Sequence, residues 1–147
     1  MAETWQDMEA IRVLKARYFR FVDTKQWDAW RALFSDDFEA VIEDDVSTGE
    51  SDGRPHPLYD ADGLVTLASE SFRSATSVHH GHMPEIDLLS PTEATGIWAM
   101  QDIITRPDGT VFRGYGHYHE RYRKDDAGWR IAHMRLTRLY LETSRPE

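Results

Sequence analysis

Three of the seven histidines in the chain lie within four residues, at His79, His80 and His82. Histidine is the side chain whose ordinary pKa lies nearest to neutral pH, and its neutral ring is also a common metal ligand. The cluster lies where the sequence pattern changes from helices to strands. Two kinds of chemistry are therefore open here: proton transfer by one imidazole with partners elsewhere in the chain, or metal binding by several imidazoles.

Metal binding would need ligands from a second segment. His117 and His119 are two residues apart and are expected on one strand face, where both neutral rings could bind zinc or iron together with His79, His80 or His82. Cysteine is absent, and no carboxylate falls at the spacing of a compact metal motif. We therefore expect no metal, with His80 at the surface or an interface and His82 in a loop or pocket wall.

Charged residues on apolar strand faces give a second signal. Side chains alternate between the two faces of a strand, which puts Asp102 on one face with Trp98 and Met100. The same alternation puts Arg138 on one face with Leu136. Because buried charges are costly unless they are paired, Asp102 and Arg138 predict a polar patch inside a pocket.

Helices are expected in the first half of the chain. Apolar residues recur at spacings of three and four from about residue 5 to residue 22, with Tyr18 in the apolar stripe and Asp23 just past it. A second, short helix is expected over residues 27–34 and a third over residues 64–72. These helices supply Tyr18 and Asp23 to any site that they cover.

Strands dominate the second half. A short strand at 38–46 and a polar loop at 47–57 come first; three long strands, separated by turn signals, follow at 94–106, 110–124 and 129–142. Helices first and strands after indicate an α+β class. We expect one domain over residues 1–147, with a curved antiparallel sheet, helices across its concave face and a cone-shaped pocket between them.

Composition excludes several functions. The net charge of -9 argues against nucleic-acid binding, which needs a basic face. No apolar run is long enough to span a bilayer, and the first residues lack the basic and apolar regions of a signal peptide. We expect a cytoplasmic protein with no membrane or nucleic-acid partner.

Several segments resemble the SnoaL-like branch of the NTF2-like superfamily. The similarity lies in residues 16–28 (ARYFRFVDTKQWD), 79–86 (HHGHMPEI), 94–98 (ATGIW) and 128–140 (GWRIAHMRLTRLY). Within the superfamily, the chain is most similar to bile-acid 7α-dehydratases and more distantly similar to scytalone dehydratases. The resemblance covers nearly the whole chain and implies a cone-shaped fold that forms dimers or trimers, so we expect a homodimer or homotrimer.

The resemblance also implies a site. The catalytic residues of the bile-acid dehydratases fall here on Tyr18, Asp23, His79, Asp102 and Arg138. The residues expected to line the substrate pocket are Trp98, Met100, His82, His117, Tyr118, Leu136 and Tyr140. These dehydratases use no metal, and the expected activity is that of a cofactor-independent dehydratase, a lyase, on a small hydrophobic, polycyclic hydroxylated substrate.

The five residue types suit general acid–base catalysis. Asp23 would accept a hydrogen bond from one nitrogen of His79, whose other nitrogen takes a proton from the substrate. Tyr18 would donate to the substrate oxygen. Asp102 would help to protonate or position the leaving hydroxyl, and Arg138 would anchor an anionic or carbonyl group or pair with Asp102.

Three other functions stay open from the sequence. Isomerisation and epoxide hydrolysis occur on the same fold, which hosts many activities. A protein that only binds a small hydrophobic ligand is the third possibility. Catalysis is favoured because a binding protein has little use for a base that is oriented by a carboxylate.

Overall fold

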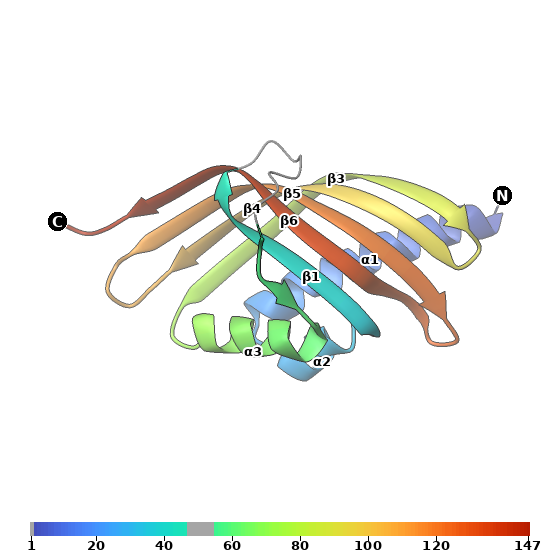
Figure 1. Cartoon of the computed structure of the whole chain (residues 1–147), viewed down its shortest axis with the longest axis horizontal. Coiled ribbons are helices and arrows are strands. Elements are labelled where there is room, and N and C mark those ends of the chain that lie inside the picture. Colours follow the sequence, from blue (N-terminus) through green and yellow to red (C-terminus); the bar gives the residue numbers. More distant parts are fainter. Residues whose placement is uncertain (1, 47–54) are drawn as a thin grey trace.

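The computed structural model describes residues 2–46 and 55–147, which form helices and one curved sheet (Figure 1). The helices are α1 (Ala2–Asp23), α2 (Trp27–Arg31) and α3 (Ala61–Ser71). The strands are β1 (Phe34–Val46), β2 (Leu58–Tyr59), β3 (Thr76–Ser90), β4 (Glu93–Thr105), β5 (Val111–Asp125) and β6 (Gly128–Ser144). The polar loop expected at 47–57 lies mostly outside the described residues, because 47–54 are not among them.

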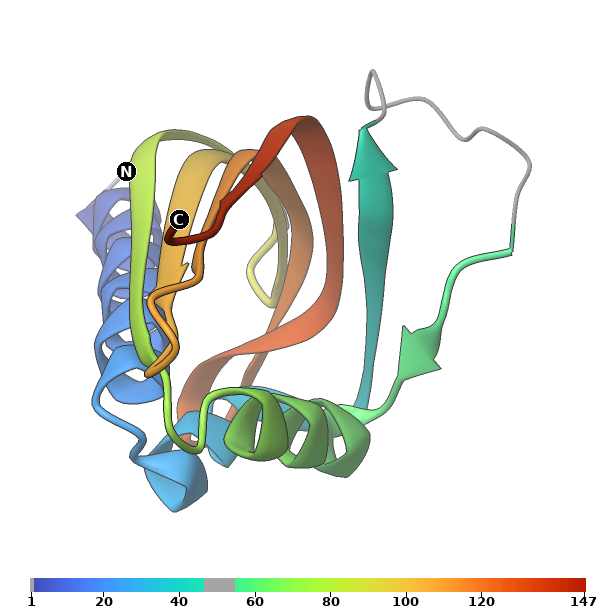
Figure 2. The same cartoon turned by 90° about the vertical axis from the view of Figure 1, so that its left-hand side faces the viewer.

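The sheet has the strand order β2-β1-β6-β5-β4-β3. The sheet is curved, with α1 along one side and α3 across one end, as Figure 2 shows. This confirms the α+β class and the curved sheet. The sheet is mixed rather than fully antiparallel, because β1 runs parallel to β6. No tight turn joins these two strands, so the hairpin geometry that makes the later strands antiparallel does not fix the direction of β1.

The second helix is shorter than expected. It ends at Arg31, and Phe34 is already the first residue of β1, where it pairs with Ile131 of β6. The expectation of a helix over 27–34 was therefore wrong at its end. Trp30 and Phe34 are four residues apart and their rings are in contact, with centroids 5.1 Å apart. Contact at this spacing is typical of a helix, but here it occurs across the junction between a helix and a strand.

The apolar stripe of α1 faces the concave side of the sheet. Ile11, Leu14, Tyr18 and Val22 are all buried, as the helical spacing predicted. They pack in one hydrophobic core with inward residues of the strands. In the part of the chain that the structure describes, no helix combines the length and apolar character needed to cross a membrane.

A charged pair lies inside this core. The side chains of Lys15 and Glu120 are fully buried and form a hydrogen-bonded ion pair. The Lys15 ammonium also lies 3.7 Å from the ring centroid of Tyr18 and 3.6 Å from that of Tyr118. Burial lowers the pKa of Lys15 to about 8, against the opposing effect of Glu120. Lys15 is four residues after Ile11 and three before Tyr18, so helical periodicity could have identified it.

We predict that Lys15→Met lowers the free energy of unfolding by about 3–5 kcal/mol, because it leaves the Glu120 carboxylate buried without its cation. The double variant Lys15→Met/Glu120→Gln removes that charge and keeps an acceptor for the Tyr122 hydroxyl, which donates to Glu120. Urea unfolding should therefore find the double variant more stable than Lys15→Met alone. A destabilisation of the double variant equal to the sum of those of Lys15→Met and Glu120→Gln would contradict a coupled pair.

Candidate functional site

A cavity of about 300 Å³ lies between the helices and the concave face of the sheet. Its apolar wall includes Val22 of α1, Leu64 of α3 and Ile104 of β4. The predicted catalytic residues Tyr18, His79, Asp102 and Arg138 also line it, and they come from four different elements. The wall thus brings together residues up to 120 positions apart, given that it contains both Tyr18 and Arg138.

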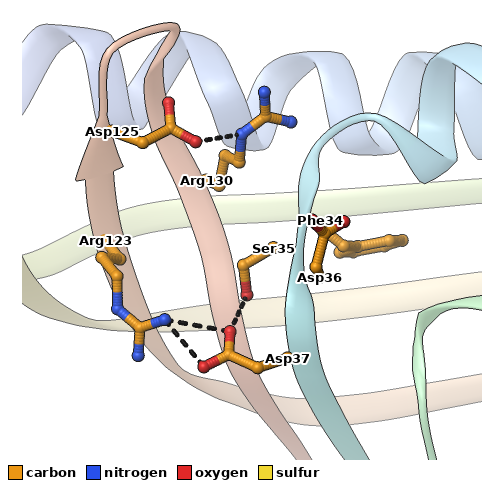
Figure 3. A pocket seen from close by; sticks show the side chains of 7 residues that line it. All are labelled: Phe34, Ser35, Asp36, Asp37, Arg123, Asp125 and Arg130. Carbon is orange, nitrogen blue, oxygen red and sulfur yellow. Dashed lines mark hydrogen bonds and ion pairs between the residues drawn. The ribbon is translucent and has the colours of Figure 1, made fainter.

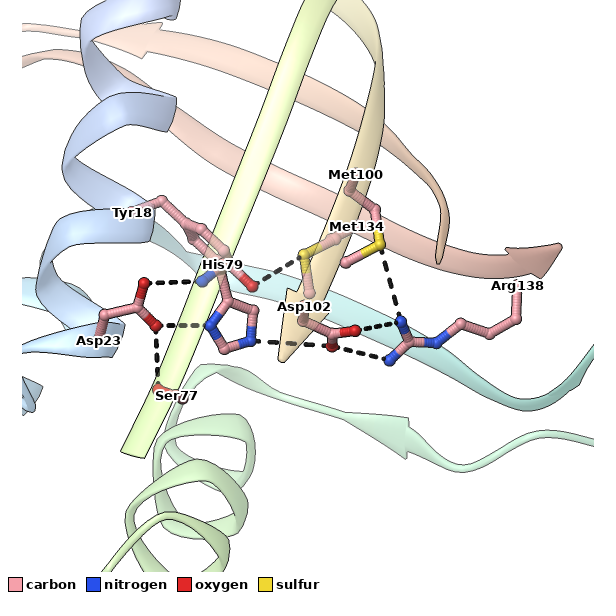
Figure 4. Close-up of polar contacts among 8 residues, drawn as sticks. All are labelled: Tyr18, Asp23, Ser77, His79, Met100, Asp102, Met134 and Arg138. Atoms are coloured by element: carbon pink, nitrogen blue, oxygen red, sulfur yellow. Dashed lines mark hydrogen bonds and ion pairs between the residues drawn. The ribbon is translucent and has the colours of Figure 1, made fainter. Parts of the chain in front are cut away.

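Asp23, at the C-terminal end of α1, is bound to β3 by three hydrogen bonds (Figure 4). Its Oδ1 lies 2.6 Å from Nδ1 of His79 and accepts from the Ser77 hydroxyl at 2.9 Å, and its Oδ2 accepts from the backbone N–H of His79 at 2.8 Å. A carboxylate can only accept a hydrogen bond, so Nδ1 carries the proton in this arrangement. The Nε2 atom of His79 is then the nitrogen that has a lone pair.

Nε2 of His79 points toward Asp102 of β4, with 3.9 Å between Nε2 and Oδ2. This distance is too long for a hydrogen bond. Asp102 instead accepts two hydrogen bonds from Arg138 of β6, at 2.9 Å to Oδ1 and 3.1 Å to Oδ2. Both side chains are buried, so the bidentate pair neutralises two charges that would be costly to bury singly. Of the two roles expected for Arg138, the structure supports pairing with Asp102.

The ion pair lies over a glycine. Gly114 of β5 is directly opposite Asp102 in the strand register. A Cβ atom at this position would lie 2.3 Å from Oδ1 of Asp102 and 2.4 Å from Nη1 of Arg138. The absence of a side chain on Gly114 therefore gives the bidentate pair its space on the concave face.

Tyr18 supplies a phenol to the cavity. Burial, with a smaller effect of Glu120, raises the pKa of Tyr18 above its ordinary value. Its hydroxyl donates to the sulfur of Met134 at 3.5 Å, and a thioether is a weak acceptor. The Tyr18 phenol is therefore protonated. A substrate oxygen could replace the Met134 sulfur as the acceptor of its hydrogen bond at little cost in free energy.

The predicted pocket-lining residues separate into two groups, of which the first lies inside. Tyr118 and Leu136 line the cavity. Trp98 and Met100 are buried on the face of β4 that carries Asp102, but they do not line the cavity. The Trp98 indole donates to the Tyr122 hydroxyl at 2.9 Å, and the Met100 sulfur lies 3.7 Å from Nη1 of Arg138.

The second group lies away from the cavity. His117 alternates with Tyr118 on β5, and His82 pairs with Ala99 on the face that also carries His117. Tyr140 is about half exposed, at 54%. The pairing of β5 with β6 shifts between Tyr115 and Gly116, and this irregularity breaks the simple alternation that placed Tyr140 with Leu136 and Arg138.

The histidines other than His79 do not assemble a metal site. Within residues 2–46 and 55–147, no group of three or more His, Asp or Glu side chains is arranged to hold a metal ion. His80 and His82 have ring centroids 6.3 Å apart, and His117 and His119 lie 6.2 Å apart in a separate pair. The geometry of the described residues therefore gives no support to the metal interpretation.

Three residues of the site were not predicted from the sequence. Ser77 shares a strand face with His79 and holds Asp23, so alternation on β3 could have identified it. Arg106 follows Asp102 and Ile104 at the same two-residue spacing and lines the cavity. Gly114 had no signal in the sequence alone, because its role depends on the register between β4 and β5.

A second hollow, of about 440 Å³, lies near the start of β1 (Figure 3). Four of its charged side chains form two pairs. Arg123 donates to Asp37 at 2.8 Å, and Arg130 donates to Asp125 at 2.7 Å. The Arg123 guanidinium holds the pKa of Asp37 below its usual range. Among the described residues that line this hollow there is no histidine and no base that a carboxylate orients, so we place the functional site in the other cavity.

Comparison with known proteins agrees with this architecture. The SnoaL-like domain family matches residues 3–135. A curated relative, the "Probable cyclase FGR4" of Gibberella zeae, is 24% identical over 152 residues, which cover 95% of this chain and 96% of that protein.

Solved structures with the same fold include two enzymes of elimination chemistry by name. Hexachlorocyclohexane dehydrochlorinase (LinA) type 2 has a TM-score of 0.82 and 17% identity, over 99% of this chain and 94% of that chain. A "Putative Scytalone Dehydratase" from Novosphingobium aromaticivorans has a TM-score of 0.78 and 19% identity, over 99% and 93%. At these identities the likeness shows the fold alone, and it is an NTF2-like fold.

We predict that Gly114→Ala displaces the Asp102–Arg138 pair, because the added methyl group occupies the space of both side-chain ends. Both groups are flexible, so the fold should survive, with a loss of about 1–3 kcal/mol from overpacking. Thermal unfolding and a crystal structure of the variant measure both effects. Gly96→Ala is the matched control, since its methyl group would meet Tyr122 instead. An unmoved ion pair in Gly114→Ala would contradict the prediction.

Proposed function

The chain belongs to the SnoaL-like domain family, and we propose that it is a cofactor-independent dehydratase, a carbon–oxygen lyase. The observation that carries the proposal is the buried His79, which Asp23 orients through Nδ1 while Nε2 faces the cavity on the side of Asp102. A base of this kind is what the removal of a proton beside a carbonyl group requires. The reaction proposed is loss of water from a β-hydroxy carbonyl compound.

In the first step, Nε2 of His79 takes the proton from the carbon beside the carbonyl group. The imidazolium that forms lies between the carboxylates of Asp23 and Asp102, which favour its positive charge. The negative charge moves to the carbonyl oxygen. The Tyr18 phenol, which now donates to the Met134 sulfur, donates a hydrogen bond to that oxygen.

In the second step, the electron pair returns from the oxygen, the carbon–carbon double bond forms and the bond to the hydroxyl breaks. The leaving hydroxyl takes the proton from the His79 imidazolium, and the products are water and an unsaturated carbonyl compound. Asp102 positions this hydroxyl rather than protonating it, because both its oxygens already accept hydrogen bonds from Arg138. The proposal thus assigns both proton transfers to His79.

The cavity supports a small hydrophobic substrate. Its volume of about 300 Å³ lies at the lower end of the range for ligand pockets, roughly 300–1,000 Å³. Apolar side chains such as Leu64, Phe72 and Ile104 form much of its wall. We propose a compact hydroxylated substrate with fused rings. Eliminations in the names of two structural neighbours, a dehydrochlorinase and a dehydratase, are in keeping with this reaction class.

Isomerisation is the second candidate. Among the described residues, His79 is the one imidazole in the cavity wall, and Asp102 is held by Arg138, so a single base could take a proton from one carbon and return it to another. The outcome depends on whether the substrate carries a leaving hydroxyl. Epoxide hydrolysis and ligand binding without catalysis are both open from the sequence. Neither would require a base that moves a proton between two carbons.

We predict that His79→Gln abolishes turnover and that Asp23→Asn lowers it by roughly 10²–10⁴, the usual contribution of general acid–base catalysis. The assay is a screen of bicyclic β-hydroxy ketones, read by the appearance of the conjugated product. His80→Gln is the matched control: it removes the adjacent imidazole, which is exposed and contacts Gln101 outside the cavity.

The three variants should have the same circular dichroism spectrum as the natural protein. Full activity in His79→Gln would refute the assignment of the base. Loss of activity in His80→Gln equal to that in His79→Gln would show that the effect is not specific to the Asp23–His79 pair.

A further inference from the structure

Arg106 is a second guanidinium in the cavity wall. It follows directly after β4, on the inward face that also carries Asp102 and Ile104, and it lines the same cavity. Unlike Arg138, it is exposed, so it lies at the rim. Its Nη1 donates to the backbone carbonyl of Ser71, the last residue of α3, at 3.1 Å. This bond holds the side chain in place at the mouth.

The two arginines of the cavity differ in their partners. Both terminal nitrogens of Arg138 donate to Asp102. Among the described residues, no carboxylate forms an ion pair with Arg106. Asp108 is near in sequence, but its side chain accepts from the backbone N–H of Thr110 at 2.9 Å, and Arg106 is only a minor cause of its lowered pKa. A guanidinium has five N–H donors, so most of those of Arg106 remain available to a ligand.

We propose that Arg106 binds a carboxylate of the substrate at the rim of the cavity, with the hydrophobic body of the substrate between Arg106 and His79. This deepens the proposed function and rests on it for the identity of the reacting end. Four residues of strand separate the backbones of Asp102 and Arg106 by about 13 Å. The carboxylate therefore lies at the end of the substrate away from the reacting carbon, about one fused-ring system distant.

The charges near the cavity favour a carboxylate over a phosphate. Arg106 presents one positive charge in a planar fork that matches the two oxygens of a carboxylate. The other charges of the site are paired or negative: Asp102 neutralises Arg138, and Asp23 is a carboxylate. A phosphate with nearly two negative charges would meet more repulsion here than a carboxylate would.

The test measures binding, so it does not depend on turnover. The probes are 2-naphthoate, methyl 2-naphthoate and 2-naphthyl phosphate, each titrated at neutral pH with ligand-observed NMR. The natural protein should bind naphthoate about tenfold more tightly than the uncharged ester, as expected for a hydrogen bond between charged groups. It should also bind naphthoate more tightly than the phosphate.

Variants locate the effect. Arg106→Gln keeps a donor for the Ser71 carbonyl but removes the charge, and it should lose the preference for naphthoate over the ester. Arg113→Gln is the matched control, because Arg113 is near the same end of the sheet but pairs with Glu142 at 3.8 Å. It should keep the preference. Leu67→Trp fills the cavity from α3 and should weaken all three probes.

Three outcomes would overturn the proposal: no preference for naphthoate in the natural protein, an unchanged preference in Arg106→Gln, or unchanged binding in Leu67→Trp. Tighter binding of the phosphate would overturn the choice of a carboxylate. The dehydratase proposal fails on a different result, which is full activity in His79→Gln. The two proposals can therefore fail separately.

Discussion

The site depends on the hydrogen bonds between Asp23 and β3. The Asp23 carboxylate accepts from the Ser77 hydroxyl, from the backbone of His79 and from the His79 ring. These hydrogen bonds fix the last turn of α1 against β3, and α1 forms one wall of the cavity. The same bonds set which nitrogen of His79 carries the proton. The carboxylate thus sets the geometry of the cavity and the protonation of its base together.

The concave face is built around paired charges. Asp102 pairs with Arg138 beside His79, and Lys15 pairs with Glu120 behind the rings of Tyr18 and Tyr118. Each pair satisfies charges that the apolar core could not hold singly. Arg106 differs because it donates to a backbone carbonyl, and this difference is the basis for assigning it to a ligand.

Periodicity within a helix or strand predicted the features that depend on that segment alone. The buried stripe of α1, with Tyr18 in it, followed from helical spacing, and Asp102 and Arg138 were identified because charges interrupted apolar strand faces. The resemblance to the SnoaL-like branch then connected these residues with Asp23 and His79. Expectations that concern the cytoplasm and a homodimer or homotrimer stay predictions.

What depends on pairing between segments could not be predicted. The space over Gly114 and the outward position of Tyr140 both follow from strand register and from its shift between Tyr115 and Gly116. Pairing of Arg138 with Asp102 was one of two roles expected for Arg138, and the register decides between them. The parallel pairing of β1 with β6 has no local signal either. Lys15 was a different case, since the helical pattern contained the signal.

The most direct test of the account is the tautomer of His79, read from long-range ¹H–¹⁵N correlations of its imidazole ring above neutral pH. We predict a proton on Nδ1, held by Asp23, and a lone pair on Nε2; the Asp23→Asn variant should lose this preference. A proton on Nε2 in the natural protein would contradict the central claim that His79 is a base aimed into the cavity.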